Sequence, residues 1–288
     1  MYDTPGLLAV HAHPDDEVIA TGGILADAAA RGLRSKVITC TDGRRGEIVG
    51  AGMDPDAIRP RLDEVRAAEL ADALAQLGVA EHAFLGYHDS GMMGVEGNAD
   101  PSAFWQADVH EAVGRLVAHI RTFQPSVAVT YDAYGGYGHP DHIQAHRITV
   151  LAIEAAGMGA LYPEAGGSWV TPKLYFATLP KSAIAQANEM FAAHGLASPF
   201  GEATDPADIP MGTEDARITT MVDVSAHMAA KQAALQAHAS QIAPDSFFLN
   251  VPEGMAQGFY GTEWFVRRHS TVSVPDDMET DLFTGVLS

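Results

Sequence analysis

The sequence LLAVHAHPDDE, residues 7–17, joins an apolar run to a short polar turn. Leu7–Val10 has the composition of a strand buried on both faces, and in an open α/β sheet functional groups gather where such strands end. Pro14 fixes φ within the turn, so His13 and Asp16 hold their relative positions at little entropic cost. An imidazole nitrogen and a carboxylate oxygen arranged in this way are typical ligands of a divalent metal ion.

A second polar turn of the same kind follows another apolar run. YGHPDH, residues 137–142, comes after the strand-like segment Val127–Tyr131 and a glycine-rich turn. His139 and His142 repeat the three-residue spacing. Because a catalytic zinc ion typically takes three protein ligands and leaves one position for water, the first turn alone supplies too few. We therefore predict that the two turns meet at one metal site, although spacing does not decide which of these two histidines is the ligand.

The segments around the two turns predict an α/β fold. Val18–Arg31 carries apolar residues at helical spacing, ends before Gly32, and is followed by the strand-like run Lys36–Thr41. Strand, helix and strand at this spacing form a βαβ unit with parallel strands. We expect a Rossmann-like, mostly parallel sheet flanked by helices, with a C-terminal α/β elaboration.

The rest of the chain continues the alternation of helices and strands without a clear linker. We expect a single domain over residues 1–288, with a core at about 1–160 and the elaboration at about 161–288. Further helices are predicted at residues 62–78, 104–123, 143–156, 182–194 and 226–240, and further strands at 84–85, 173–179 and 217–224.

Charge and cysteine content narrow the range of partners and compartments. Lys and Arg number 17 against 37 Asp and Glu, and the net charge of -20 disfavours nucleic acid and anionic membrane surfaces as partners. The single cysteine, Cys40, lies in an apolar run and fits a reducing compartment. Because neither a leader segment nor an apolar run of about 20 residues is visible, we expect a cytoplasmic protein without a membrane span. The oligomeric state is not predicted.

Several motifs resemble one enzyme family. AHPDDE at residues 12–17 and GGYGHPDH at 135–142 are similar to the zinc-dependent N-deacetylases related to glycosylphosphatidylinositol de-N-acetylases and LmbE-like proteins. TCTDGRRGEIVG at 39–50, AHASQI at 237–242 and ETDLFTG at 279–285 extend the resemblance over most of the chain. The most similar branch is that of mycothiol metabolism, which contains the N-acetylglucosaminyl-inositol deacetylase and the mycothiol S-conjugate amidase.

The resemblance implies a metal site and a set of catalytic groups. It implies that His13, Asp16 and His142 bind Zn²⁺, or alternatively Fe²⁺. Asp15 lies beside a ligand without being one, so it is expected to accept a proton from water and to deliver it to the leaving amine.

Three residues of the second turn are expected to assist the reaction. His139, if protonated, or Tyr137 is expected to stabilise the tetrahedral oxyanion. Asp141 is expected to orient a histidine of its own motif and to raise the pKa of that histidine.

By the same resemblance, Glu47, Arg66 and Asp89 are expected to bind substrate hydroxyl or phosphate-like groups. For the first two, a plain surface residue is the competing interpretation. His238 in AHASQI is more simply explained as a structural hydrogen-bonding residue than as an extra ligand.

The family resemblance leaves the substrate open between two branches. The amidase branch has a lysine shortly after HPDDE, where this chain has Val18, Ile19 and Ala20, whereas AHASQI and the stretch around Glu263 are more similar to the amidase. We expect deacetylation of N-acetylglucosaminyl-inositol, with S-conjugate amide cleavage or deacetylation of another aminosugar compound as alternatives.

Two functions of other classes fit the sequence less well. A non-catalytic sugar-binding or metal-storage protein would have no need of the base, and Asp15 is present. A nucleotide-binding protein would have glycines in the first turn, where this chain has two acids that repel phosphate.

Overall fold

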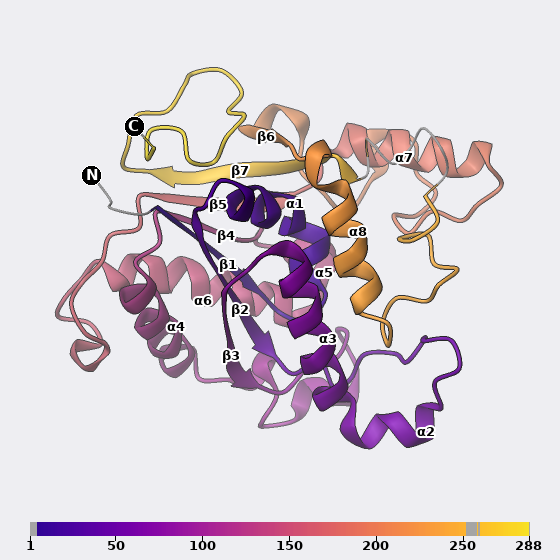
Figure 1. Ribbon diagram of the computed structural model, residues 1–288, viewed down its shortest axis with the longest axis horizontal. Coiled ribbons are helices and arrows are strands. Elements are labelled where there is room, and N and C mark those ends of the chain that lie inside the picture. The colour runs from indigo at the N-terminus through magenta and orange to yellow at the C-terminus, as the bar shows by residue number, and fades with distance from the viewer. Residues whose placement is uncertain (1–4, 252–257, 259, 288) are drawn as a thin grey trace.

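The fold is built on a seven-stranded sheet, seen in the computed structural model, which describes residues 5–251, 258 and 260–287 (Figure 1). The strand order is β3-β2-β1-β4-β5-β7-β6. The five strands from β3 to β5 are parallel to one another, and β7 runs antiparallel to both β5 and β6. The strands are β1 (Gly6–His11), β2 (Arg34–Thr41), β3 (Glu81–Tyr87), β4 (Val127–Tyr131), β5 (Lys173–Thr178), β6 (Thr220–Asp223) and β7 (Thr262–Ser270).

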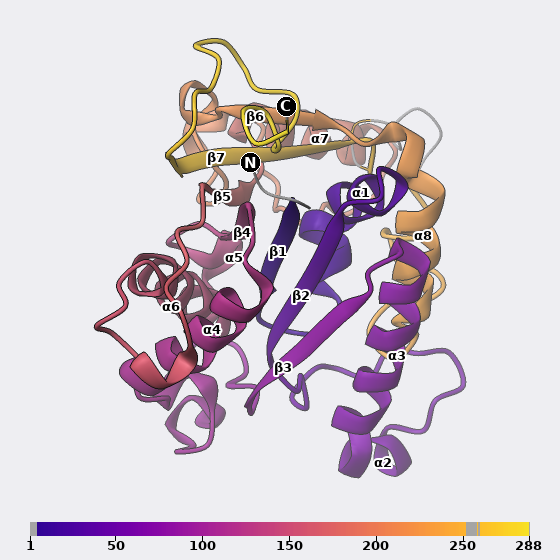
Figure 2. The same cartoon turned by 60° about the vertical axis from the view of Figure 1, so that its left-hand side comes forward.

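Helices cover both faces of the parallel part of the sheet (Figure 2). On one face α1, α3 and α8 pack against one another, and on the other face α4 packs against α6. The helices are α1 (Asp16–Ala30), α2 (Pro55–Ile58), α3 (Leu62–Leu77), α4 (Val109–Phe123), α5 (Gly135–Gly138), α6 (Pro140–Ala156), α7 (Lys181–Ala193) and α8 (Met228–Ala237). The predicted α/β class with a mostly parallel sheet is confirmed.

The central strand β1 shows why the sequence reads as a continuous apolar run. Leu7 and Ala9 belong to the core shared with α1 and α3, whereas Leu8 and Val10 belong to the core shared with α4 and α6. Because successive side chains of a strand point to opposite faces, a sheet covered on both faces needs apolar residues at every position.

The strand order reverses between β1 and β4, which are neighbours. Leu7 pairs with Val127 and Ala9 with Val129. In open α/β sheets the crevice outside the carboxyl ends of such a strand pair is the usual ligand site. The first polar turn follows β1 and the second polar turn follows β4 by way of α5, so the topology itself directs both toward one crevice.

Several predicted boundaries differ from those of the structure. The helix expected at 104–123 begins at Val109, because the Asp108 side chain accepts a hydrogen bond from the Glu111 backbone N–H (2.8 Å) and forms an N-cap. Residues 104–106 form a separate 3₁₀ turn. The strand expected at 84–85 covers Glu81–Tyr87, and β7 was not predicted from the sequence at all. In the described ranges, no helix has both the length and the apolar character needed to cross a bilayer.

The C-terminal elaboration extends the same sheet and is held by a buried ionic cluster. Glu279 is almost fully buried and accepts hydrogen bonds from Lys173 Nζ, Tyr175 OH (2.7 Å), Thr220 Oγ1 (3.1 Å) and Arg267 Nη1 (3.0 Å). These partners lie on β5, β6 and β7, so a single carboxylate ties the C-terminal segment to three strands.

Stability should therefore depend on Glu279 and on pH. Burial by itself would raise the pKa of Glu279, but the bonds from Lys173 and Tyr175 lower it below the ordinary value of 4.5. The carboxylate thus stabilises the fold above that value, and this contribution is lost as the pH falls through the lowered pKa. We expect Glu279→Gln to lower the free energy of unfolding at pH 7 by about 3 kcal/mol, because it leaves Lys173 without its ionic partner.

Urea unfolding of both proteins between pH 3 and pH 7 measures this effect. The difference between them should shrink toward the acid end. Asp277→Asn, at an exposed position of the same segment, is the control. A pH-independent difference would contradict the assignment.

Candidate active site

Three potential metal-ligand atoms form a nearly equilateral triangle at the ends of β1 and β4. His142 Nε2 lies 3.3 Å from His13 Nδ1 and 3.4 Å from Asp16 Oδ2, and the remaining side measures 3.4 Å. All three side chains are buried. The structure therefore brings together the two polar turns, which are more than a hundred residues apart in sequence.

The hydrogen bonds of the two histidines aim both lone pairs into the triangle. His142 Nδ1 faces the Gly135 carbonyl oxygen (3.1 Å), and His13 Nε2 faces Asp141 Oδ2 (3.1 Å). Since each of those nitrogens must donate to its oxygen, His142 Nε2 and His13 Nδ1 are left as acceptors. With both rings neutral, three acceptors that face one another within 3.4 Å repel one another unless a proton or a metal ion lies between them.

The dimensions and the charges of the triangle both fit such a cation. Tetrahedral ligands at about 2.0–2.1 Å from a zinc ion lie about 3.3–3.4 Å from one another. Burial would lower the pKa of His13, but Asp89, Asp141 and Asp16 outweigh it and raise that pKa strongly. The field that favours an imidazolium here equally favours a metal ion.

Two other groupings of ligand atoms include His139. In one grouping, one ligand atom each of His13, His139 and His142 lie within 4.8 Å of one another. The other grouping joins one ligand atom each of His13, Asp89, His139 and Asp141 within the same distance. His139 Nδ1 is already occupied, because it accepts the Asp141 backbone N–H (3.1 Å). We therefore regard the triangle as the candidate metal site.

Asp15 lies beside this triangle in a strained conformation. Its φ of 123° falls in a region that residues with a Cβ rarely adopt, which costs about 1–3 kcal/mol. One carboxylate oxygen accepts a hydrogen bond from Arg66 Nη2 (3.0 Å). Burial raises the pKa of Asp15 to about 6, although Arg66 opposes the shift. A carboxylate held in this way is available to exchange protons near neutral pH.

The surroundings of His139 decide its protonation, which the sequence left open. Burial, with the neighbouring His13 and His142, lowers the pKa of His139 to about 3, so the imidazole is neutral rather than protonated. Because its Nδ1 accepts a hydrogen bond, the proton resides on Nε2. Tyr137 is 46% exposed and lies edge-on to His142, with ring centroids 4.9 Å apart.

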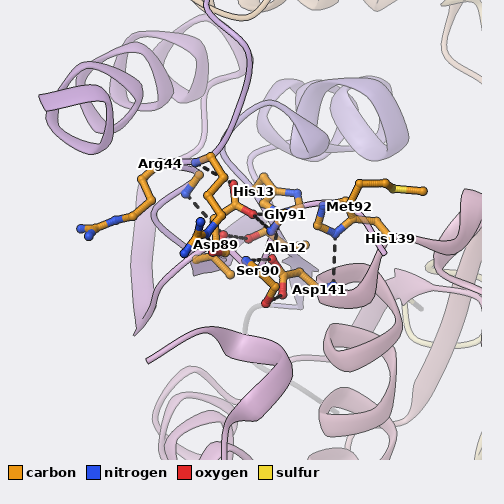
Figure 3. Close-up of polar contacts among 12 residues, drawn as sticks. Ala12, His13, Arg44, Asp89, Ser90, Gly91, Met92, His139 and Asp141 are labelled. Carbon is orange, nitrogen blue, oxygen red and sulfur yellow. Dashed lines mark hydrogen bonds and ion pairs between the residues drawn. The ribbon is translucent and has the colours of Figure 1, made fainter. Parts of the chain in front are cut away.

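The side chain of Asp141 forms a hydrogen bond with a histidine of the other motif, not of its own. Its Oδ2 pairs with His13 Nε2, and it also accepts hydrogen bonds from the Ser90 backbone N–H (2.8 Å) and from the Ser90 hydroxyl (Figure 3). The expectation that Asp141 orients His139 or His142 is corrected, since only its backbone N–H contacts His139. The helix start explains the difference, because His139 is the N-cap of α6 and its ring caps the helix.

A cavity of about 870 Å³ opens beside these residues. Asp15, Asp89 and His139 are among the residues that line it. Its wall includes Arg66, Glu47 and further charged and apolar residues, namely Arg44, Arg45, Arg59, Asp63, Met92, Val95, Glu96 and Gln241. All three residues expected to bind substrate therefore line one cavity. Glu47 is exposed, whereas Arg66 and Asp89 are each 3% exposed.

Comparison with known proteins identifies the family of this chain. The family described as GlcNAc-PI de-N-acetylase (PIG-L) matches residues 8–153, which include both polar turns. A deacetylase from Geodermatophilus obscurus is 42% identical over 97% of this chain and 97% of its own. The chain belongs to the PIG-L family.

Three relatives of this PIG-L protein share one name. The proteins from Geodermatophilus obscurus and Streptomyces avermitilis are both called 1D-myo-inositol 2-acetamido-2-deoxy-alpha-D-glucopyranoside deacetylase. The second is 43% identical over 99% of each chain. Thermobifida fusca has a protein of the same name that is 43% identical over 96% of this chain and 98% of its own.

Solved structures show that the fold alone does not decide the chemistry. The N,N'-diacetylchitobiose deacetylase from Pyrococcus horikoshii, in complex with an inhibitor, has a TM-score of 0.64 at 18% identity and covers 92% of this chain and 84% of its own. GalB, a 4-carboxy-2-hydroxymuconate hydratase from Pseudomonas putida KT2440, has a TM-score of 0.59 at 20% identity and covers 94% and 99%. Both share the architecture, so activity must be argued from the site.

Several supporting residues of the PIG-L site were missed from the sequence. Ser90 holds Asp141, and the Tyr131 ring stacks on His142 with centroids 4.2 Å apart. Arg45 donates from its backbone N–H (3.1 Å) and its Nε (2.8 Å) to Asp89. A serine, a strand tyrosine and a loop arginine have many ordinary roles, so their residue types alone give no signal.

His238 is a buried hydrogen-bonding residue and lies outside the metal triangle, as predicted. Its Nε2 lies 2.7 Å from Glu17 Oε1, and both side chains are fully buried. Burial would lower the pKa of His238, but Glu17 outweighs it and the pKa is raised.

The contact between Asp141 and His13 predicts how the metal affinity depends on Asp141. We expect Asp141→Asn to weaken metal binding by about 10–100-fold, because a neutral amide oxygen is a weaker acceptor for the His13 Nε2–H than the carboxylate and holds the ring that presents Nδ1 less firmly. Titration with a competing chelator measures the affinity. Asp223→Asn, at an exposed position on β6, should leave it unchanged. An unaltered affinity in Asp141→Asn would show that His13 does not need this partner.

Proposed function

We propose that this protein hydrolyses the acetamide of N-acetylglucosaminyl-inositol, 1D-myo-inositol 2-acetamido-2-deoxy-α-D-glucopyranoside, to the free amine and acetate. The observation that carries the proposal is the near full-length similarity, at 41–43% identity, to relatives that bear this substrate in their names. The cavity beside the metal triangle supports it, since a volume of about 870 Å³ is in the range of small-molecule sites.

We propose His13, Asp16 and His142 as the ligands and Zn²⁺ as the ion. Two neutral imidazoles and a carboxylate suit Zn²⁺, and the same donor set also suits Fe²⁺. Burial lowers the pKa of His142 to about 4, which keeps it neutral and able to bind a metal. When bound, the ion supplies Lewis acidity, which polarises the acetamide carbonyl and makes water more acidic.

The remaining steps fall to residues of the chain. Asp15 accepts a proton from the water that attacks the carbonyl carbon, and then gives it to the amine nitrogen as the C–N bond breaks. The His139 Nε2–H donates to the carbonyl oxygen as negative charge develops there. Burial raises the pKa of Tyr137, so its hydroxyl keeps its proton and is a second donor.

Asp141 is proposed to assist through His13. Its carboxylate fixes the ring that presents Nδ1 to the ion, and its role is therefore to position a ligand and not to contact the substrate.

The cavity wall is proposed to bind the sugar and inositol hydroxyls. Asp89 and Glu47 offer carboxylate oxygens as acceptors, and Arg66 offers guanidinium donors. Arg66 also donates to the Gly43 carbonyl (2.7 Å) and to Asp15, so it holds the cavity loop beside the base. A cytoplasmic location is part of the proposal and is supported by the lone, buried thiol of Cys40.

Assays of two substrates test the proposed activity. The protein should release amine from N-acetylglucosaminyl-inositol faster than it cleaves a mycothiol S-conjugate, measured as kcat/KM side by side. A preference for the conjugate would replace the deacetylase assignment with the amidase.

Replacing the base tests the proposed mechanism. Asp15→Asn should lower kcat by about 10²–10⁴-fold, the usual contribution of general acid–base catalysis, while KM changes little. Metal content, measured by atomic emission, should match the unsubstituted protein, since Asp15 is not one of the ligands. Turnover by Asp15→Asn at the unsubstituted rate would refute its role.

The metal assignment has its own test. Dialysis against a chelator should abolish turnover, and Zn²⁺ should restore it at one ion per chain. Restoration by Fe²⁺ but not by Zn²⁺ would correct the identity of the ion. Restoration by Mg²⁺ alone would contradict the donor set, because Mg²⁺ prefers oxygen ligands.

A further inference from the structure

The AHASQI segment, which the proposed mechanism does not use, ends in a buried hydrogen-bond chain that leads to Asp15. Glu17 Oε1 lies 2.7 Å from His238 Nε2, and Glu17 Oε2 accepts the backbone N–H of Asp15 (2.9 Å). Glu17 and His238 are both completely buried. One carboxylate thus joins the end of α8 to the residue at the start of α1.

This chain of hydrogen bonds acts on Asp15, which has the most strained backbone among the described residues of the site. Asp15 has a φ of 123°, and its side chain makes no capping bond to the helix that it precedes. A conformation of this kind persists only where surrounding contacts hold it. The bond from the Asp15 N–H to Glu17 acts on the backbone itself, whereas the Arg66 contact acts on the carboxylate.

A purely structural role explains the pair poorly. Burying two ionisable groups is costly, and an apolar pair of similar size often packs as well or better. His238 Nδ1 is also buried without a hydrogen-bond partner in the described part of the chain, so the bond to Glu17 is the one polar contact that its ring makes there. The arrangement is therefore directed at Glu17, and through Glu17 at Asp15.

The segment that carries His238, at the far end of the hydrogen-bond chain, is firmly anchored. Ser240 donates from its backbone N–H and its hydroxyl to Glu69 of α3, each at 2.7 Å. The Ser240 carbonyl accepts the Val49 N–H (2.9 Å) from the loop that carries Glu47. His238 therefore lies in a segment that is tied to α3 and to the cavity loop.

We propose that His238 is a positioning residue, which through the buried carboxylate of Glu17 holds the backbone of Asp15 in the conformation that presents its side chain to the reacting atoms. The inference rests on the proposed function only in taking Asp15 as the base. The geometry of Asp15 is a separate, structural prediction.

Two near-isosteric substitutions separate positioning from packing. The amide nitrogen of Gln reaches the place of Nε2 in the imidazole, whereas the shorter Asn reaches only the place of Nδ1. We expect His238→Gln to keep kcat within about threefold, and His238→Asn to lower it by about 10–100-fold, the usual range for a supporting-shell residue. KM and metal content should be unchanged in both. Equal kcat values for the two variants would overturn the proposal, as would loss of the metal together with activity in His238→Asn.

A matched control removes another buried ion pair of the same helix. Lys231 lies on α8 and pairs with Glu263 (2.7 Å), with both side chains 4% exposed. Lys231→Met should lower the Tm while leaving kcat unchanged, because this pair does not contact Asp15. If its kcat falls as far as that of His238→Asn, general loosening of α8 explains both effects and the proposal fails.

A double substitution tests whether His238 acts through Asp15. In the Asp15→Asn background, His238→Asn should cause no further loss of kcat, because the group being positioned is gone. A further loss equal to that in the unsubstituted background would show an independent role and overturn the proposal.

Crystal structures decide the matter without any substrate. The φ of Asp15 should stay near 123° in the unsubstituted protein and in His238→Gln, and should become negative in His238→Asn. An unchanged φ in His238→Asn would refute the proposal. Failure of the unsubstituted protein to deacetylate N-acetylglucosaminyl-inositol would count against the proposed function alone.

Discussion

The parallel pairing of β1 with β4 is the contact on which the site depends. Register pairs such as Leu7 with Val127 bring the carboxyl ends of the two strands to one edge of the sheet, at the point where the strand order reverses. Each strand is followed by a proline-stiffened polar turn. Residues separated by more than a hundred positions can therefore present ligand atoms within 3.4 Å of one another. Burial of the apolar strands, and not contact between the ligand atoms, supplies the free energy that brings these residues together.

The polar groups behind the triangle give it its chemical character. Gly135 and Asp141 accept hydrogen bonds from the two histidines. In the neutral rings the remaining lone pairs therefore point inward, where they suit a cation. Asp141 belongs to the second turn yet supports a ligand in the first. The two turns thus depend on each other, which makes the site a single unit and not two adjacent motifs.

Fold and function are only loosely linked in this architecture, since a hydratase and a deacetylase both share it. The neutral state of His139 illustrates what the individual site adds. Burial lowers its pKa to about 3, so the group that faces the cavity is a hydrogen-bond donor without a charge. In the proposed function, His139 and the strained Asp15 are the donor and the base of amide hydrolysis.

The sequence by itself determined the α/β class and the strand β4 at its observed bounds, because these depend on local patterns. The proposed metal ligands followed from the two polar turns together with the family resemblance, since spacing did not decide between His139 and His142. An apolar run, a proline turn and a helix start can all be recognised within a stretch of about 15 residues. Tertiary structure alone decided that Asp141 pairs with His13, that His139 is neutral, and that His238 reaches Glu17. Each of these depends on which buried groups come within hydrogen-bond distance, and that is set by packing between distant segments. The strand β7 was missed for the same reason, since its partners β5 and β6 define it more than its own residues do.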